Sequence, residues 1–203
     1  MNRRKSIVRI IVVGVLVLLV ALAGFLGKYH TRYRLSAEAA ARTNPGIGES
    51  SKLINKLHFS WGEVELFDSQ KGYRSAVIEK RGLFWTNPAT FVVPNDNSDT
   101  VRTVSLVSYS HVPNIAVTTL VVLTTSKNVA YIEAGPMSDR VKKPIQIGNP
   151  TVFSWNQMLN ANDLNAIAYS KNGHELYEYG YPKNKSGINL TTDLRWYPVG
   201  VTH

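Results

Sequence analysis

The chain contains no cysteine among its 203 residues. Disulfide bonds, thiolate zinc sites, iron–sulfur clusters, cysteine nucleophiles and cysteine-linked lipid anchors are therefore all excluded. An exported domain of this chain must take its stability from its core alone. The composition allows this, because 44% of the residues are hydrophobic and 18% are charged, which is too apolar for a disordered chain.

Catalytic signatures are also lacking. The sequence has no H-E-x-x-H motif, no G-x-S-x-G nucleophile elbow and no glycine-rich phosphate loop. Residues 154–156 (S-W-N) and 185–187 (K-S-G) resemble two motifs of penicillin-recognising enzymes, but no serine is followed by lysine three positions later. That chemistry therefore has no nucleophile. The five histidines are scattered without metal-ligand spacing, and we predict no catalytic residue, no metal site and no cofactor.

The net charge of +9 does not indicate nucleic-acid binding. Residues 1–34 hold seven of the 23 basic residues and no acid, which leaves 16 basic against 14 acidic residues in the rest of the chain. A nucleic-acid-binding domain carries its basic excess on the folded part. The remainder of this chain is nearly neutral, so no nucleic-acid partner is expected.

Residues 10–27 are apolar and uncharged. A helix of this length covers about 27 Å, close to the thickness of the hydrocarbon core. Because four basic residues precede it, the positive-inside rule places residues 1–9 in the cytoplasm as a basic tail and the C-terminal domain outside the cell membrane. The alternative is a signal peptide cleaved after Ala23, behind the A-L-A of residues 21–23.

Residues 28–49 are expected to join the span to the outer domain. Residues 28–43 are rich in helix formers, so the membrane helix is expected to continue through them as a stalk. Asn44-Pro45-Gly46 ends it, because proline cannot donate a backbone hydrogen bond and the residue before it avoids the helical region. Residues 44–49 are then the hinge.

Residues 50–203 are predicted to form an extracytoplasmic β-rich domain. Residues 50–59 and 156–165 are expected to be short helices. Strands are expected in the following ranges: 64–67, 73–80, 89–93, 100–110, 115–125, 129–135, 165–170, 174–181 and 194–199. The segment 115–125 is nearly continuous in β-formers and is typical of a central strand that is buried on both faces. The fold class is therefore mainly β, with antiparallel hairpins in a sandwich-like or curved sheet.

Several stretches carry a family resemblance. "GEVELF" (62–67) is followed by a turn and "YRSAVIEKRGLFW" (73–85), and "VVLTTSKNVAYIEAG" (121–135) is later matched by "NAIAYSKNGHELYEYGY" (165–181). In these respects the chain resembles a group of small membrane-anchored extracytoplasmic proteins of Bacillus-like bacteria. The resemblance implies a location and a β-rich build. It carries no activity and no site residues.

Three tyrosines occupy alternate positions of one expected strand. Tyr177, Tyr179 and Tyr181 share a strand face, and the opposite face is mostly polar. We favour packing against the core, because aromatic residues suit strands for packing reasons. The alternative is an aromatic platform that binds the sugar rings of the cell wall, so these three residues are the candidate ligand-binding site.

Acidic residues offer one further hypothesis. Glu63 and Glu65 are expected to share a strand face, and we favour a solvated surface position for both; the alternative is that they repel each other or bind a cation. A hydrolase would require several of five acids to converge on one cleft: Glu63, Glu65, Asp139, Glu175 and Asp193. The favoured function is a membrane-anchored, non-catalytic module that contacts an envelope protein or a cell-wall polymer. The alternatives are an acid-dependent envelope hydrolase and a secreted β-domain.

Overall fold

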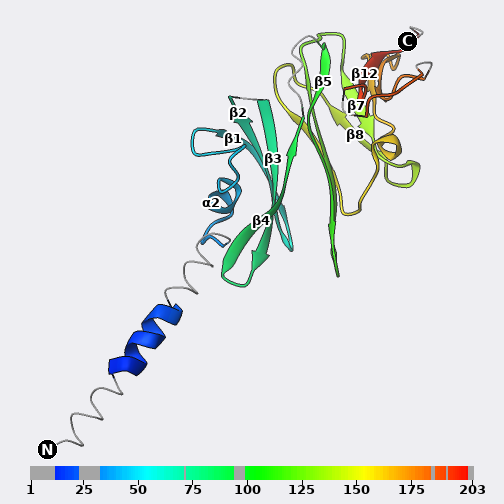
Figure 1. Ribbon diagram of the computed structural model, residues 1–203. Coiled ribbons are helices and arrows are strands. Elements are labelled where there is room, and N and C mark those ends of the chain that lie inside the picture. Colours follow the sequence, from blue (N-terminus) through cyan, green and yellow to red (C-terminus); the bar gives the residue numbers. More distant parts are fainter. Residues whose placement is uncertain are drawn as a thin grey trace, which may run out of the picture.

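The structure is a computed structural model that describes residues 12–22, 33–70, 72–93, 99–183, 186–190 and 192–200. It is mainly β, and every pair of neighbouring strands is antiparallel, as predicted (Figure 1). The strands are β1 (Lys52–Phe59), β2 (Gly62–Ser69), β3 (Gly72–Arg81), β4 (Phe84–Val92), β5 (Val101–His111), β6 (Ile115–Thr124), β7 (Tyr131–Ala134), β8 (Val141–Pro144), β9 (Thr151–Trp155), β10 (Ile167–Tyr169), β11 (Glu175–Gly180) and β12 (Arg195–Pro198).

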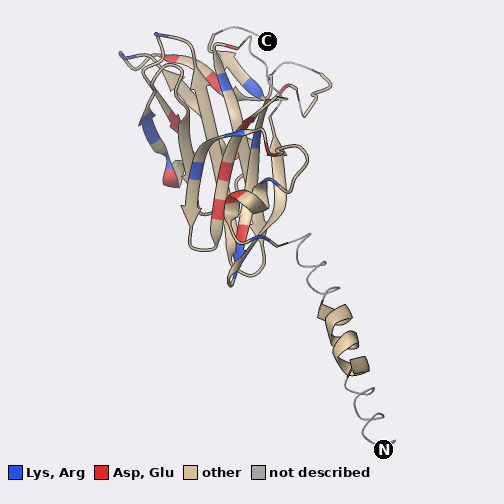
Figure 2. Ribbon diagram, turned by 90° about the vertical axis from the view of Figure 1, so that its left-hand side faces the viewer, with Lys and Arg blue, Asp and Glu red and all other residues tan. Residues whose placement is uncertain are grey.

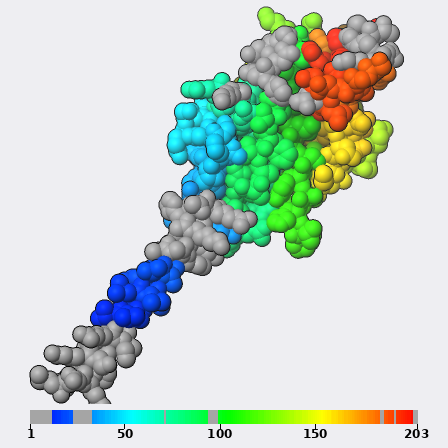
Figure 3. Space-filling view, viewed as in Figure 1, coloured from blue at the N-terminus to red at the C-terminus, as the bar shows by residue number. Residues whose placement is uncertain are grey.

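The strands form three sheets that lie in layers. The first sheet has the order β1-β2-β3-β4, the middle sheet β5-β6-β9, and the third sheet β12-β11-β10-β7-β8. Figure 3 shows the first sheet in cyan on one side of the molecule and the C-terminal strands in orange and red on the other. The domain is thus a β-sandwich of three layers, whereas an ordinary β-sandwich has two.

Strand β6 explains why the middle sheet is covered on both sides. Val117 and Val121 pack in the clusters shared with the first sheet, whereas Leu120 and Val122 pack in the cluster shared with the third. Alternate residues of a strand point to opposite faces, so a strand buried at nearly every position needs a partner layer on each side. The prediction of a doubly buried central strand at 115–125 is confirmed.

A short helix, α2 (Ala37–Ala41), covers the outer face of the first sheet. Its small side chains allow close approach to the strands. Together with residues of the following loop and of β2 and β3, they form a buried cluster: Ala37, Ala40, Ala41, Ile47, Phe67, Ala76 and Ile78. Ser36 caps the helix by accepting a hydrogen bond of 3.3 Å from the amide of Ala39.

The expected stalk helix is wrong for residues 33–36. Arg34 instead pairs with Trp85 through two backbone hydrogen bonds of 2.8 and 2.9 Å, beside the first residues of β4. In the expected hinge, Ile47 is buried under the first sheet, so part of this segment belongs to the domain core. Residues 28–32 lie outside the described residues.

The helix expected at 50–59 is also wrong, because this segment forms β1. Its apolar spacing suited a helix, but β1 has a register irregularity between Leu53 and Asn55 that shifts the apolar residues by one position. Pairing with β2 then decides the conformation. The helix expected at 156–165 is reduced to the 3-10 turn η2 (Ala161–Leu164), and a second 3-10 turn, η1 (Met137–Asp139), was not predicted. Strands β8 and β9 were not predicted either.

An N-terminal helix covers residues 12–22. Residues 10, 11 and 23–27 of the expected span lie outside the described residues. None of the helices in the described ranges has the length and apolar character needed to cross a bilayer.

Two ends of the sandwich can be distinguished. The near end holds the turns at residues 60–61, 82–83 and 112–114, because β2 starts opposite the end of β3, and His111 at the end of β5 contacts Glu79 and Arg81 near the end of β3. The pairing of Arg34 with Trp85 brings residue 33 to this end. The far end holds the starts of β3 and β5.

Candidate functional site

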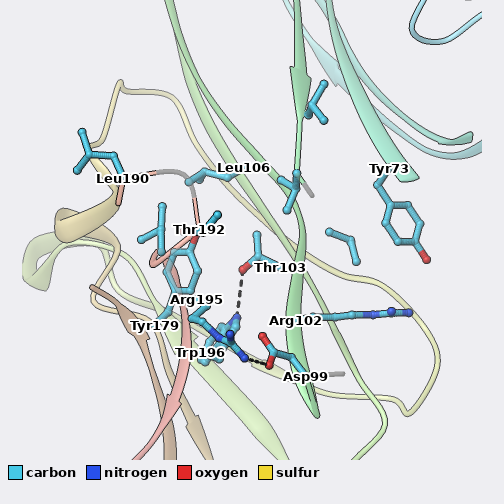
Figure 4. Close-up of a pocket in the computed structure, with 14 residues that line it drawn as sticks. Tyr73, Asp99, Arg102, Thr103, Leu106, Tyr179, Leu190, Thr192, Arg195 and Trp196 are labelled. Carbon is cyan, nitrogen blue, oxygen red and sulfur yellow. Dashed lines mark hydrogen bonds and ion pairs between the residues drawn. The ribbon is translucent and has the colours of Figure 1, made fainter. Parts of the chain in front are cut away.

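A cavity of about 390 Å³ opens at the far end between the first, middle and third sheets (Figure 4). Its walls come from segments that are distant in the sequence: the start of β3, the end of β4, the first half of β5, Tyr179 of β11, and residues 190–196. The labelled wall residues are Tyr73, Asp99, Arg102, Thr103, Leu106, Tyr179, Leu190, Thr192, Arg195 and Trp196. Aromatic surface and arginine side chains therefore share one concave site.

The aromatic wall is held in place by Thr103 of β5. The indole of Trp196 donates a hydrogen bond of 3.1 Å from Nε1 to Thr103 Oγ1. The ring of Tyr179 lies against that of Trp196, with centroids 5.4 Å apart. Burial raises the pKa of Tyr179, against a smaller opposite effect of its hydrogen bond with Thr103. The phenol therefore stays neutral at physiological pH.

The polar side of the cavity is built on an ion pair. The guanidinium of Arg195 contacts the carboxylate of Asp99, which joins β12 to the segment that precedes β5. Arg102 lies on the adjacent wall (Figure 4). Asp99 is the one acid among the described lining residues.

The three candidate tyrosines do not share one environment. Tyr179 is 8% exposed and belongs to the core between the middle and third sheets. Tyr177 is half-buried and lines a second hollow on the other side of Arg195. Tyr181 follows β11 and donates a hydrogen bond of 3.3 Å to the carbonyl of Leu190. Of the three, Tyr179 alone lines the cavity of Figure 4.

Glu63 and Glu65 lie on one face of β2, as expected from their spacing, but both are buried rather than solvated. Lys56 of β1 places its Nζ 2.7 Å from Glu65 Oε1 and 3.6 Å from Glu63 Oε2, so a side chain of the protein supplies the positive charge there. Burial raises the pKa of Glu65. Figure 2 shows acidic and basic positions side by side on this face of the first sheet.

The acids named for a hydrolase do not converge on the cavity. None of Glu63, Glu65, Asp139, Glu175 and Asp193 is among its lining residues. Across the described ranges, no cluster of histidine, aspartate and glutamate side chains has the arrangement of a metal site.

A second polar cluster, at the near end, was missed by the sequence analysis. The carboxylate of Glu79 on β3 is buried and accepts a hydrogen bond of 2.8 Å from the hydroxyl of Tyr109 on β5. His111 Nδ1 lies 2.6 Å from Glu79 Oε1, and Arg81 also pairs with the carboxylate. The spacing of Tyr109 and His111 on one strand was visible in the sequence. The packing of β3 against β5, which belong to different sheets, was not visible in the sequence.

The pKa values of this cluster are set by burial and by the hydrogen bonds and charge around the Glu79 carboxylate. Burial acts to raise the pKa of Glu79, but the hydrogen bonds from His111 and Tyr109 and the charge of Arg81 outweigh it and hold the pKa below its usual value. Burial and the bond to Glu79 raise the pKa of Tyr109 to about 12. The cluster is therefore an ionised carboxylate held by neutral and cationic donors.

In comparisons with known proteins, the chain matches no family model, no curated protein and no solved structure.

Proposed function

We propose that the chain is a membrane-anchored, extracytoplasmic, non-catalytic module that holds a partner, an envelope protein or a cell-wall polymer, in the cavity of its far end. The observation that carries the proposal is the position of this cavity. It lies at the end of the sandwich opposite to the one where residue 33 enters. A module tethered at one end presents its other end to whatever surrounds the cell.

The N-terminal helix supports the anchor. Its large apolar side chains, Val12, Val13, Val15, Leu16, Val17, Leu18, Leu19, Val20 and Leu22, are 48–71% exposed. A helix that is hydrophobic on all sides needs a protein core or a lipid environment around it. The clusters of the described core do not include these residues. Together with the uncharged run at 10–27 and the basic residues before it, this favours a lipid-spanning segment.

The walls of the cavity favour binding over catalysis. General acid–base chemistry needs titratable groups within reach of the substrate. The lining residues include one acid, Asp99, and its carboxylate is already paired with Arg195. Aromatic rings beside arginine instead suit a ligand with flat apolar faces and anionic groups. The hydrolase remains the alternative, and so does release of the domain after Ala23.

A crosslinking experiment tests the binding proposal. Leu190 is an exposed cavity residue, so the fold should tolerate a photoreactive amino acid at this position, where its side chain would face the ligand. The matched control is Ile147, also exposed, next to Gly148, whose amide bonds the carbonyl of Thr124. Full-length protein in living cells is expected to give an adduct with an envelope protein or wall polymer from position 190 and none from position 147. Identical adducts from both positions would contradict the proposal.

The topology has its own test. Protease added to intact protoplasts is expected to digest the domain, because it lies outside the cell. Protection of the domain would show that the orientation is wrong, and a mature N-terminus at Gly24 would show that the segment is a signal peptide.

A further inference from the structure

We infer that the near end rests on the bilayer surface, with the tips of its turns in the interfacial layer and its cations against anionic headgroups. The inference rests on the proposed membrane anchor and adds a second, peripheral contact to it. Four observations carry it: exposed apolar tips, aromatic side chains, exposed cations and a short tether.

The apolar tips are the first observation. Leu83 in the β3–β4 turn is 84% exposed, Val112 in the β5–β6 turn is 86% exposed, and Leu35 is 80% exposed. One other large apolar residue of the described chain, Met137, reaches this level. Single exposed apolar residues are ordinary, but a group of them at one end of a molecule marks an interaction surface.

Contacts between neighbouring residues show that the three tips belong to one surface. The ring of Tyr33 meets that of Phe84 edge-on at 6.3 Å, which places Leu35 near the β3–β4 turn. Arg81 lies 3.3 Å from His111, the residue before Val112. Figure 3 shows the β5–β6 turn in green as a projection from this end.

Aromatic side chains surround the tips. Trp85 pairs with Arg34, and Trp61 in the β1–β2 turn stacks on Phe59 with centroids 5.2 Å apart. The amide of Lys80 bonds the carbonyl of Trp61, which ties this turn to the β3–β4 hairpin. Tryptophan and tyrosine favour the headgroup level of a membrane, where one part of the ring system is apolar and the other is wet.

The charge of the near end is positive toward solvent. Lys80 and Arg81 are exposed, and Lys80 Nζ lies 5.6 Å above the ring of Trp85. Glu63 and Glu79, the acids on β2 and β3 next to these turns, are buried, and Glu79 pairs with Arg81 itself. Anionic lipids attract such juxtamembrane cations, and the attraction falls off within a Debye length of the surface.

The tether keeps the near end at the membrane. Six peptide units separate residue 27, where the expected span ends, from residue 33, where the described domain begins. A chain of that length reaches at most about 20 Å even when fully extended. The near end therefore cannot move far from the headgroups, and contact with them costs little additional translational and rotational entropy. A second copy of the chain is not required to cover the tips.

The absence of native cysteine allows a direct test with the full-length protein in nanodiscs that contain anionic lipid. Single variants Leu83→Cys, Val112→Cys and, as the control, Ile147→Cys carry an environment-sensitive fluorophore. Ile147 is exposed and apolar like the other two but lies beside the end of β6, at the far end. We expect lipids that carry a nitroxide quencher to reduce emission at positions 83 and 112 several-fold more than at position 147.

Equal quenching at the three positions in a chain that stays in the nanodisc would overturn the inference and leave the anchor intact. Shielding at positions 83 and 112 that depends on protein concentration but not on the quencher would point to a second copy, and would also overturn it. Loss of the chain from membranes washed with alkaline carbonate would overturn the anchor and the inference together. As a second readout, Leu83→Ser with Val112→Ser is expected to abolish the difference in tryptophan quenching between anionic and neutral discs.

Discussion

The hydroxyl of Tyr109 on β5 donates a hydrogen bond of 2.8 Å to the buried carboxylate of Glu79 on β3. The two residues belong to different sheets, so this bond ties the first layer of the sandwich to the middle one. Elsewhere in the same interface, Ser75 Oγ and Ser105 Oγ lie 2.5 Å apart. Aliphatic and aromatic side chains from both sheets form the two hydrophobic clusters of this interface.

Removal of the Tyr109 hydroxyl is expected to destabilise the domain. A hydrogen bond to a charged group contributes about 1.5–3 kcal/mol, so Tyr109→Phe should lower the free energy of unfolding by about that amount. The matched control is Tyr169→Phe, whose hydroxyl lies 3.5 Å from Glu175 in an exposed position. The control should change stability by less than about 0.5 kcal/mol. Denaturant unfolding measures both, and equal effects would show that the bond to Glu79 is unimportant.

The Glu79 carboxylate should make stability depend on acid pH. Its folded-state pKa lies below the usual value of 4.5, so the unfolded chain binds the proton more readily. Stability is therefore fully present above that value and decreases as the pH falls through the lower, folded-state pKa. Glu79→Gln should cost about 2 kcal/mol at pH 7 and progressively less as the pH falls below 4.5. Urea unfolding at several pH values tests this, and a gap independent of pH would contradict it.

Lys56 should be needed mainly because it neutralises a buried acid. In Lys56→Met the carboxylate of Glu65 loses the cation 2.7 Å away and remains fully buried. Breaking such a pair costs about 3 kcal/mol at pH 7, and the cost should shrink as acid protonates Glu65. The control is the double variant Lys56→Met with Glu65→Leu, which should regain most of the loss because no buried charge remains. If the double variant is as unstable as the single one, the charge is not the cause.

Tyr179 should be structural even though it lines the cavity. Truncation of a buried aromatic residue costs about 3–5 kcal/mol, so Tyr179→Ala should lower the free energy of unfolding by that amount. Tyr181→Ala is the control from the same face, and its half-buried ring should cost less than half as much. Thermal or urea unfolding distinguishes them. A Tyr179→Ala protein that is as stable as the wild type but has lost its crosslinks from position 190 would make this residue a ligand contact instead.

Two strand glycines should respond oppositely to alanine. A Cβ at Gly62 would lie 2.0 Å from the carbonyl oxygen of Ile78, so Gly62→Ala must push β2 and β3 apart. We expect a loss of about 2–3 kcal/mol. At Gly180 no heavy atom lies within 4 Å of the Cβ position, and Gly180→Ala should be neutral or stabilise the domain by up to about 1 kcal/mol. Calorimetric melting of both variants checks the contrast.

Local patterns predicted the strands well where the chain carries a turn between two alternating runs. The hairpin of β2 and β3 and the hairpin of β10 and β11 follow directly from strand-like runs around polar turns. The helix expected at 50–59 was wrong, because its apolar spacing suits a helix and a strand with a register irregularity equally well. Helix propensity in residues 33–36 likewise yielded to pairing with β4. In both places a distant partner decided the structure.

The candidate site was predictable only in part. Alternation in β11 singled out Tyr179, but the cavity also needs Trp196 and Thr103, which meet across 93 positions of the sequence. The buried state of Glu79 was equally hidden, because its partners stand about 30 positions away on β5. Contacts of this kind follow from the stacking of sheets, which local periodicity does not encode.

The layering has a consequence for the order in which the chain emerges during synthesis. The first sheet is complete when residue 92 has appeared, but its inner face has no cover until β5 and β6 follow, up to residue 124. The face of β6 that packs against the third sheet stays exposed until that sheet has been synthesised. The last strand of the third sheet ends five residues before the C-terminus. A chain synthesised from its N-terminus would thus expose an apolar sheet surface for most of its synthesis. This surface would be fully covered only after Trp196 has been added. Factors that shield nascent chains would be most needed in the interval between those two points.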